Sequence, residues 1–449
     1  MWPIINLILL IAFAFLSVRI LSGAYVKSRT LVLPDYPEYK YMMDPKMFFV
    51  IFLILTGPFY LSQFALFKYG VFFLIVLYLL FISNSIRIPW NIIVISYSIF
   101  LIWLFVCAWR IGFTHDAMMG LIKYIIPLFA LALGYSSIEN KYDLYYLMKI
   151  VAIGAVIYVL LCGGISFKLT NWLYRICSNF IITYGGLTDY LASLSVIPLL
   201  LWWWTENKKW IWVFLIICSS PVLESVRTGL GASTIAAMIF CLFRFKWKSL
   251  PFIPIILIAS LSIVIYVPSV REKFFGEDSD VTNEEIMTGE ALTLDNMHTN
   301  GRAVLWGMTE EALFKGHEMC GSGLGEANRM VRTWRSWGMP IPGLLHNDYV
   351  QIKCDTGLIG LWLFIIFGAT VFIYIGRRIW SIQDMTSRVC GILALASSGS
   401  IAFSMGFDNV VSHSMSSMII PFLFIGFFLK LYPQDNDEII VEDDDTDNR

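Results

Sequence analysis

Long apolar segments recur from one end of this 449-residue chain to the other, and 58% of its residues are hydrophobic. Crossing the hydrocarbon core of a bilayer takes roughly 20 apolar residues. In lipid such segments must be helices, because every backbone amide needs an internal partner; a β-barrel would show alternating segments of about ten residues. We therefore expect an all-α polytopic membrane protein with about 12–13 transmembrane helices, at 3–22, 47–66, 71–86, 91–109, 117–136, 144–163, 189–204, 210–226, 229–245, 250–268, 356–376, 389–407 and 414–432.

The first segment begins MWPIINLILL and has neither a basic start nor a small-residue cleavage site, which predicts a retained helix. Lys and Arg in short loops predict which loops face the cytoplasm. One alternate set of loops is rich in them: Lys27, Arg29, Lys40, Lys46, Arg87, Lys141, Lys208, Lys209, Arg244, Lys246, Lys248, Arg377, Arg378 and Arg388. The other set carries few: Lys68, Arg110, Lys168, Arg175 and Arg227. This asymmetry predicts a cytoplasmic C-terminus and an outer position for residues 269–355.

The apolar pattern divides the chain into four parts. Residues 1–268 form an N-terminal bundle, 269–355 an outer loop, 356–432 a C-terminal group of helices, and 433–449 an acidic, disordered cytoplasmic tail. A structureless loop as long as 269–355 would be unusual, so we expect it to be folded and functional. Most cysteines lie within apolar segments. Cys320 and Cys354 lie in or beside the outer loop, where they either form a disulfide with each other or stay free.

Two patterns in the outer loop predict local structure. In GRAVLWGMTEEALFKG (301–316), apolar residues recur at helical spacing and predict an amphipathic helix that begins near Arg302; they are Val304, Leu305, Met308, Ala312 and Leu313. In CGSGLGEAN, clustered glycines either form simple turns or expose amide groups to an anion. No dinucleotide fingerprint or phosphate-binding P-loop follows them.

Several basic residues are candidates for anion or glycan binding. Arg329, Arg332 and Arg335 share one helical face, which is either an exposed surface or a strip for lipid phosphate or acidic glycan. Arg227 lies in a short turn between two apolar runs, where a charge is costly unless it faces a cavity or partner; pairing with Glu224 or snorkelling is the alternative. Lys123 lies inside an apolar run. Asp408, near the outer end of the twelfth predicted helix, is a candidate buried partner.

His346 opens HNDYVQIKCDTGLIG, where the polar loop returns to an apolar helix. A titratable imidazole at this boundary is placed for chemistry at the membrane surface, whereas the plainer interpretation is a histidine that caps the helix. No metal-binding CxxC or HExxH pattern is present.

Three features together resemble the bacterial O-antigen polymerase/O-antigen ligase superfamily. They are SVRTGLGA around Arg227, GRAVLW…GSGLG in the outer loop, and His-Asn followed after nine residues by Gly-x-x-Gly in HNDYVQIKCDTGLIG. The motifs cover roughly 225–365. The helix count and the position of the long loop also agree with this family, and the resemblance implies a fold like that of other lipid-carrier (GT-C-like) glycosyltransferases.

The resemblance implies transfer of a glycan from undecaprenyl diphosphate to a sugar hydroxyl at the periplasmic face of the bacterial inner membrane. By this resemblance His346 is the base, and Arg227 and Arg302 bind the diphosphate. Asn347, Tyr349 and Gln351 would support the base or contact sugar. The family implies an inverting reaction without metal or cofactor, and partners that are glycolipids, with a chain-length regulator for polymerases; no nucleic acid is expected.

Polymerase and ligase share this chemistry. A ligase must bind a phosphorylated lipid A core, which favours a basic outer face, yet residues 269–350 hold seven Lys or Arg against thirteen Asp or Glu. The balance favours a polymerase of surface polysaccharide repeat units, with the ligase as the alternative. A transporter or flippase for a lipid-linked oligosaccharide is the alternative of another class. It is less favoured because no inverted repeat is evident and the polar residues gather near the predicted outer surface.

Overall fold

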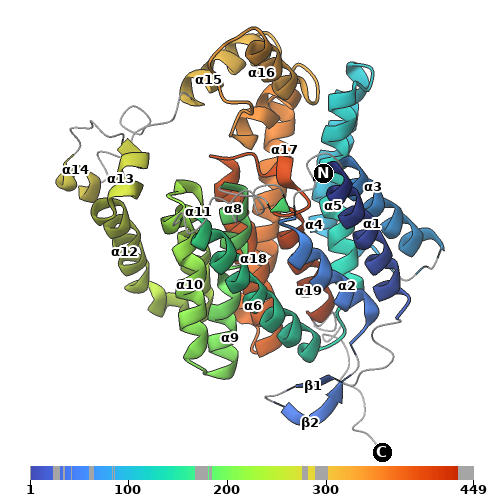
Figure 1. The fold of residues 1–449 in the computed structure, drawn as a ribbon, viewed down its shortest axis with the longest axis vertical. Helices are drawn as coiled ribbons and strands as arrows, with labels where there is room; N and C mark the ends of the chain where they lie inside the picture. The colour runs from blue at the N-terminus through green and yellow to red at the C-terminus, as the bar shows by residue number, and fades with distance from the viewer. Residues whose placement is uncertain are drawn as a thin grey trace, which may run out of the picture.

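The computed structural model describes residues 2–23, 31–33, 36–41, 43–59, 65–82, 84, 86–166, 180–181, 185–275, 282–288 and 302–432. The predicted tail 433–449 and the loop residues Lys27, Arg29, Lys168 and Arg175 lie outside these ranges. Figure 1 shows a bundle of roughly parallel and antiparallel helices, with α15 and α16 at one end and a small hairpin at the other.

Within the described residues, eight stretches of helix are long and apolar enough to cross a membrane, or nine if one bent pair is a single span. They are α1 (Trp2–Leu21), α4 (Ile92–Arg110), α5 (His115–Ser137), α6 (Lys141–Ser166), α8 with α9 (Gly185–Leu194 and Val196–Thr205), α11 (Arg227–Phe245), α17 (Asp348–Ser381) and α18 (Met385–Met405). The bent pair is α12 (Phe252–Tyr266) and α13 (Pro268–Phe275), which meet at 90°. The chain is therefore an α-helical, multi-pass membrane protein.

Four predicted segments form shorter helices than expected. They are α2 (Pro45–Thr56), α3 (Ala65–Leu77, extended by a π turn at Tyr78–Ile82), α10 (Lys209–Leu223) and α19 (Ile419–Leu431). Each thus corresponds to a helix of 10–17 apolar residues, below the roughly 20 that a perpendicular span needs. The hairpin of β1 (Leu31–Leu33) and β2 (Tyr36–Tyr41), which pair antiparallel, was not predicted from the sequence.

The bundle core is tightest where α19 lies against α5 and α18. A side chain on Gly134 would stand 2.4 Å from the Leu423 carbonyl oxygen, and one on Gly426 would stand 2.3 Å from that of Leu131. Small residues at such crossings let two helical backbones approach closely, which is how helices associate in lipid. The C-terminal helix α19 is therefore central to the bundle, and its inner surface is buried along its length.

The long helix α17 is broken near its start at Gly357, where φ is 70° and ψ is −171°. This conformation is essentially restricted to glycine. The break frees the carbonyl groups of Cys354 and Asp355, which accept hydrogen bonds from the backbone N–H groups of Ser322 and Gly323 at 2.9 and 3.0 Å. In return, the N–H groups of Leu358 and Ile359 donate to the carbonyl groups of Glu318 and Met319. The outer loop is thus joined to α17 by main-chain hydrogen bonds.

The glycines of CGSGLGEAN form the loop side of this junction with α17. Gly321, Gly323 and Gly325 all have positive φ, and a side chain on Gly321 would stand 2.4 Å from the backbone nitrogen of Thr356. Their N–H groups are engaged: Gly321 donates to His317, Gly323 to Asp355, and Gly325 to the Asp355 carboxylate. The interpretation as a set of turns therefore describes this loop better than the interpretation as an anion-binding nest.

Side chains reinforce the same junction. The Asp355 carboxylate accepts from the N–H groups of Gly325 and Ala327 at 2.9 and 2.8 Å, and so caps α16 (Glu326–Ser336). Arg110, at the end of α4, donates to the carbonyl groups of Cys320 and Gly321. Cys320 and Cys354 are both free thiols in this arrangement.

The described parts of the outer loop pack in two places. Near α12, the helices α13 and α14 (Asn283–Thr288) share a small apolar cluster that includes Val264, Phe275 and Ile286. A second cluster joins α15 (Arg302–Thr309), the π turn Glu310–Phe314 and α16 to the start of α17. Leu305, Met308 and Leu313 pack in this cluster as predicted, but Val304 and Ala312 are exposed. The apolar stripe is therefore narrower than the sequence predicted. The π turn at Glu310–Phe314 changes the helical register before Ala312, which turns this residue away from the cluster.

We predict that Gly357→Ala destabilises the protein by about 2–4 kcal/mol, because alanine cannot adopt this φ and ψ without strain and its methyl group would stand 2.2 Å from the Met319 carbonyl oxygen. The matched control is Gly368→Ala in the same helix, where nothing lies within 4 Å of the added methyl group. The control should be neutral or stabilising by about 1 kcal/mol. Thermal unfolding in detergent measures both, and equal melting temperatures would contradict the prediction.

Candidate active site

His346 lies in the connection between α16 and α17, with a positive φ of 55°. Its backbone N–H donates to the side-chain oxygen of Asn409 at 3.0 Å, and its Nδ1 lies 3.0 Å from Asp408 Oδ1. The imidazole is 25% exposed. His346 does not cap α17, because Asn347 does so by accepting from the N–H of Val350. With Nδ1 directed at Asp408, the second ring nitrogen is left for another partner.

Asp408 sits in the turn after α18 and is 15% exposed. Burial raises the pKa of this carboxyl, but the hydrogen bonds from His346 and from the N–H of Asn409, with the charges of His346 and Arg302, outweigh burial and hold its pKa below the usual value. An ionised carboxylate beside the imidazole fixes the ring orientation. His346 and Asp408 therefore form a histidine–carboxylate pair.

Two further carboxylates hold the segment around Asp408. Asp189, buried in α8, accepts from the Ser404 hydroxyl at 2.8 Å. Asp348, buried at the start of α17, accepts from the N–H of Val411 at 3.1 Å. The turn that carries Asp408 is thus attached to two helices that are far apart in sequence. Buried ionisable groups of this kind are costly in a membrane protein and commonly mark function.

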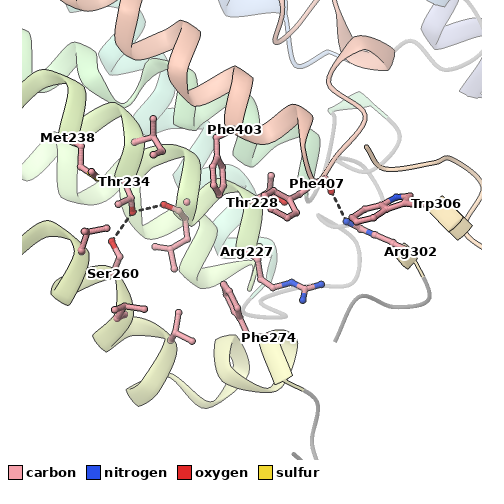
Figure 2. Close-up of a pocket in the computed structure, with 16 residues that line it drawn as sticks. Arg227, Thr228, Thr234, Met238, Ser260, Phe274, Arg302, Trp306, Phe403 and Phe407 are labelled. Carbon is pink, nitrogen blue, oxygen red and sulfur yellow. Dashed lines mark hydrogen bonds between the residues drawn. The ribbon is translucent and has the colours of Figure 1, made fainter. Parts of the chain in front are cut away.

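Arg227 and Arg302 line one cavity of about 310 Å³. Figure 2 shows the two guanidinium groups at one end, while apolar side chains and the hydrogen-bonded pair Thr234–Ser260 occupy the remainder. The walls come from α11, α12, α13, α15 and the end of α18. Arg227, the first residue of α11, lies with its guanidinium 5.6 Å from the centre of the Phe274 ring. The cavity is therefore apolar along its length and cationic at one end.

Arg302 connects this cavity to the histidine–carboxylate pair. Its guanidinium donates to the Phe407 carbonyl at 2.7 Å, one residue before Asp408. Burial lowers the pKa of Arg302, and the nearby Asp408 and Asp189 charges act against that shift. From the same helix, the Trp306 indole donates to the Leu345 carbonyl, one residue before His346. α15 thus contacts both chain segments that carry the pair, one residue before each of its members. Arg302 and Arg227 line the cavity, whereas His346 is not among its lining residues.

The predicted arginine strip is an exposed face of α16. Arg329 forms an ion pair with Glu326 on the same helix, and Arg332 pairs with Asp116 of α5 at 2.6 Å. Arg335 is exposed as well. Two of the three charges are thus matched by carboxylates, and none of the three lines the Arg227 cavity.

The remaining predicted residues do not line the Arg227 cavity. Tyr349 donates to the Ala402 carbonyl at 2.7 Å and so ties α17 to α18. Lys123 and Gln351 line a second, smaller cavity of about 200 Å³ between α5, α16 and α17. They are not part of the Arg227 cavity.

Sequence reasoning missed Asp189 and Asn409. Asp189 opens an apolar segment, and a carboxylate at such a position is a signal that could have been used. Asn409 directly follows Asp408 in a polar turn, and nothing in its sequence context indicates that its amide orients the backbone of His346.

A family profile described as O-antigen ligase (Wzy_C) matches residues 212–365. This region runs from α10 into α17, past its break, and it includes Arg227, Arg302 and His346. The match covers about a third of the chain and supports a relationship to the O-antigen polymerase and ligase superfamily. The family is one of glycosyltransferase-type enzymes, so its members act on a lipid-linked glycan and an acceptor. No curated protein matches the chain significantly.

The depressed pKa of Asp408 predicts a pH-dependent contribution to stability. Its carboxylate stabilises the folded protein above the unfolded pKa of about 3.9, and this contribution is lost as pH falls through the lower folded pKa. Asp408→Asn should therefore lower the melting temperature at pH 7, and its difference from the wild type should shrink as pH falls below about 4. The exposed Glu311→Gln serves as the control and should show little difference at any pH. A deficit in Asp408→Asn that does not change with pH would contradict the prediction.

Proposed function

We propose that this protein is a metal-independent, inverting glycosyltransferase that polymerises repeat units carried on undecaprenyl diphosphate. The observation that carries the proposal is the Arg227 cavity, which combines an apolar interior with two guanidinium groups. One of them, that of Arg302, donates to the Phe407 carbonyl next to Asp408, the partner of His346. A polyprenyl diphosphate has the matching chemistry, with an apolar chain attached to an anionic group. The family match supports O-antigen chemistry in general.

Arg227 and Arg302 are suited to bind the diphosphate, which is the leaving group. A guanidinium stays charged, donates in a planar fork and binds phosphate oxygens in pairs. When the bond between the sugar and the diphosphate breaks, negative charge builds up on the phosphate oxygens. Two fixed positive charges at a partly dry cavity end stabilise that charge most strongly in the transition state. They supply the positive charge that a divalent cation provides in other phosphate-handling enzymes.

His346 is suited to activate the acceptor. With Nδ1 on Asp408, the free Nε2 accepts the proton from an acceptor hydroxyl. The hydroxyl oxygen attacks the anomeric carbon, the bond from that carbon to the diphosphate oxygen breaks, and undecaprenyl diphosphate leaves with the electron pair. One displacement of this kind inverts the anomeric centre. Asp408 and Asn409 act as positioning residues for His346.

The charge of the outer segment favours polymerase over ligase. Residues 269–350 contain seven basic and thirteen acidic residues. The pairs Arg329–Glu326 and Arg332–Asp116 further reduce the net positive charge of the α16 face. A surface with so little free positive charge suits an acceptor that is another lipid-linked repeat unit better than a heavily phosphorylated lipid A core.

We also propose that the site faces the periplasm, in the inner membrane, with the C-terminus in the cytoplasm. α15 and α16 lie at the end of the bundle opposite the β1–β2 hairpin, which belongs to a Lys- and Arg-rich loop (Figure 1). Cations also pack on aromatic rings in the other basic loops, as where Arg244 and Arg388 lie 4.5 and 5.0 Å from the Trp203 ring. Such pairs are typical of a membrane–water interface on the side rich in basic residues. On this basis, residues 269–355 carry the periplasmic part of the active site between two groups of membrane helices.

Purified protein given one lipid-diphosphate-linked repeat unit, without another acceptor, should make a ladder of longer products on a gel. His346→Ala should reduce the rate of ladder formation by about 10²–10⁴, since it removes the base. His317→Ala, which removes an exposed histidine of the same outer segment, should keep the wild-type rate. A wild type that gives no ladder but transfers glycan to added lipid A core is a ligase. An active His346→Ala would contradict the role of this residue.

Arg227→Met and Arg302→Met should each lower kcat/KM for the lipid-linked donor by about 10–100-fold, because each removes charged hydrogen bonds to the diphosphate. Arg244→Met lies at the opposite end of the same helix as Arg227 and should leave kcat/KM near the wild-type value. Steady-state rates at several donor concentrations, compared at equal amounts of folded protein, distinguish these results. Equal losses in all three variants would indicate a structural effect alone.

A further inference from the structure

A cavity of about 380 Å³ lies between α6 and α10, at the end of the bundle opposite α16. α5 begins beside α16, where Asp116 pairs with Arg332, and α6 begins near the point where α5 ends. The residues that line this cavity come from the first half of α6, the end of α9 and the first turns of α10. The cavity therefore has no part in the site around His346.

Lys149 and Lys209 bring two cations to this cavity from different helices. Lys209 is the first residue of α10, whereas Lys149 follows the start of α6 at Lys141 by eight residues. Eight residues advance a helix by about 12 Å. A cation so far along a membrane helix is costly unless it reaches polar groups. None of the described residues that line the cavity is acidic, so the lining is cationic and attracts an anion.

The far end of the same cavity is apolar. Ile153 lies one turn beyond Lys149 on α6, and Val213 lies one turn beyond Lys209 on α10. Ile153 is 51% exposed, so the cavity opens at the surface of the bundle that faces lipid. Exposed apolar side chains continue along both helices beyond it: Ile157 and Leu160 on α6, and Leu215 and Ile216 on α10. The cavity thus changes from cationic to apolar along the direction of the membrane helices.

Aromatic rings surround the cationic end. The Nζ of Lys149 lies 5.7 Å from the centre of the Tyr145 ring, and Tyr145 packs edge-on against Trp204. Trp210 lines the cavity beside Lys209. Tyr and Trp gather where the headgroups of a bilayer meet water, and a cation on an aromatic face is stabilised there. The surroundings of the two lysines are therefore typical of the layer that holds lipid phosphates.

The two ends of the cavity together define the ligand. A soluble anion would satisfy the lysines and leave the apolar end uncovered, whereas a neutral lipid would cover the apolar end and leave the lysines without a counter-charge. An anionic phospholipid does both, because its phosphate is attached to apolar chains. Basic pockets between membrane helices, on the side rich in Lys and Arg, bind such headgroups. Lys141, Lys208 and Lys209 all belong to loops of that basic set.

We propose that this cavity binds one anionic phospholipid of the surrounding membrane, with Lys149 and Lys209 on its phosphate and an acyl chain along Ile153 and Val213. The ligand is a membrane component and not a substrate, so the inference does not depend on the proposed function. In the orientation proposed above, the lipid belongs to the cytoplasmic leaflet. It contacts both α6 and α10 and so stabilises their packing at this end.

The test titrates lipid-free, full-length protein in neutral detergent with phosphatidylglycerol or with phosphatidylcholine, and native mass spectrometry counts the bound lipid. Wild type should bind phosphatidylglycerol more tightly. Lys209→Met should weaken this binding about 5-fold and Lys149→Met/Lys209→Met about 25-fold, because each lysine near an anionic lipid contributes about 1 kcal/mol. Binding of phosphatidylcholine should change little. The matched control is Lys248→Met, which removes an exposed lysine of another basic loop that does not line this cavity.

Melting temperatures give a second measurement. Phosphatidylglycerol should raise the melting temperature of wild type and Lys248→Met, and should leave that of the double variant unchanged; the values without lipid show whether each variant is folded. Equal loss of binding in Lys248→Met and Lys209→Met would overturn the proposal, since it indicates general attraction to a basic surface. Inorganic phosphate that binds with the same dependence on the two lysines would also overturn it, as would a polyprenyl phosphate that binds more tightly than phosphatidylglycerol.

Discussion

The main-chain hydrogen bonds between residues 318–323 and the break in α17 hold this structure together at the end that carries α15 and α16. They exist because Gly357 leaves the helical conformation and frees the carbonyl groups of Cys354 and Asp355. A break in a helix near the membrane is tolerated where other protein groups satisfy the freed amides. Here the partner is the glycine loop, so the fold of the outer segment and the path of α17 depend on each other.

The position of His346 follows from this junction. The Asp355 carboxylate caps α16, Asn347 caps α17, and the short connection between the two helices carries His346 with a positive φ. The Asn409 amide and the Asp408 carboxylate then fix its backbone and ring. Left-handed backbone conformations outside glycine persist where surrounding contacts enforce them, often at functional sites. The imidazole is thus placed by main-chain geometry as much as by its own side-chain contacts.

Particular residues show how far sequence reasoning reached. Arg227 was singled out because a charge between two apolar runs is costly, and Arg302 because of the family resemblance; the two line one cavity. Asp408 was noted as a candidate buried partner, but its partner was not identified, because the two residues are 62 positions apart. Arg329 and Arg332 were candidates for anion binding, yet the structure gives them carboxylate partners on α16 and α5. Asp189 was missed altogether. Patterns along one helix are visible in sequence, whereas contacts between distant helices are not.

The sequence alone determined that the chain is a bundle of membrane helices, where nearly every helix lies and that a folded segment interrupts the series near its C-terminal third. These features follow from local hydropathy, which every short stretch of chain carries for itself. Only the tertiary structure decided which polar groups meet: that the glycines join the outer loop to α17, that Asp408 faces His346, and that Arg227 and Arg302 line one cavity. Those features depend on close approach between segments far apart in the chain, and on backbone conformations such as that of Gly357, which the packing of the whole bundle selects.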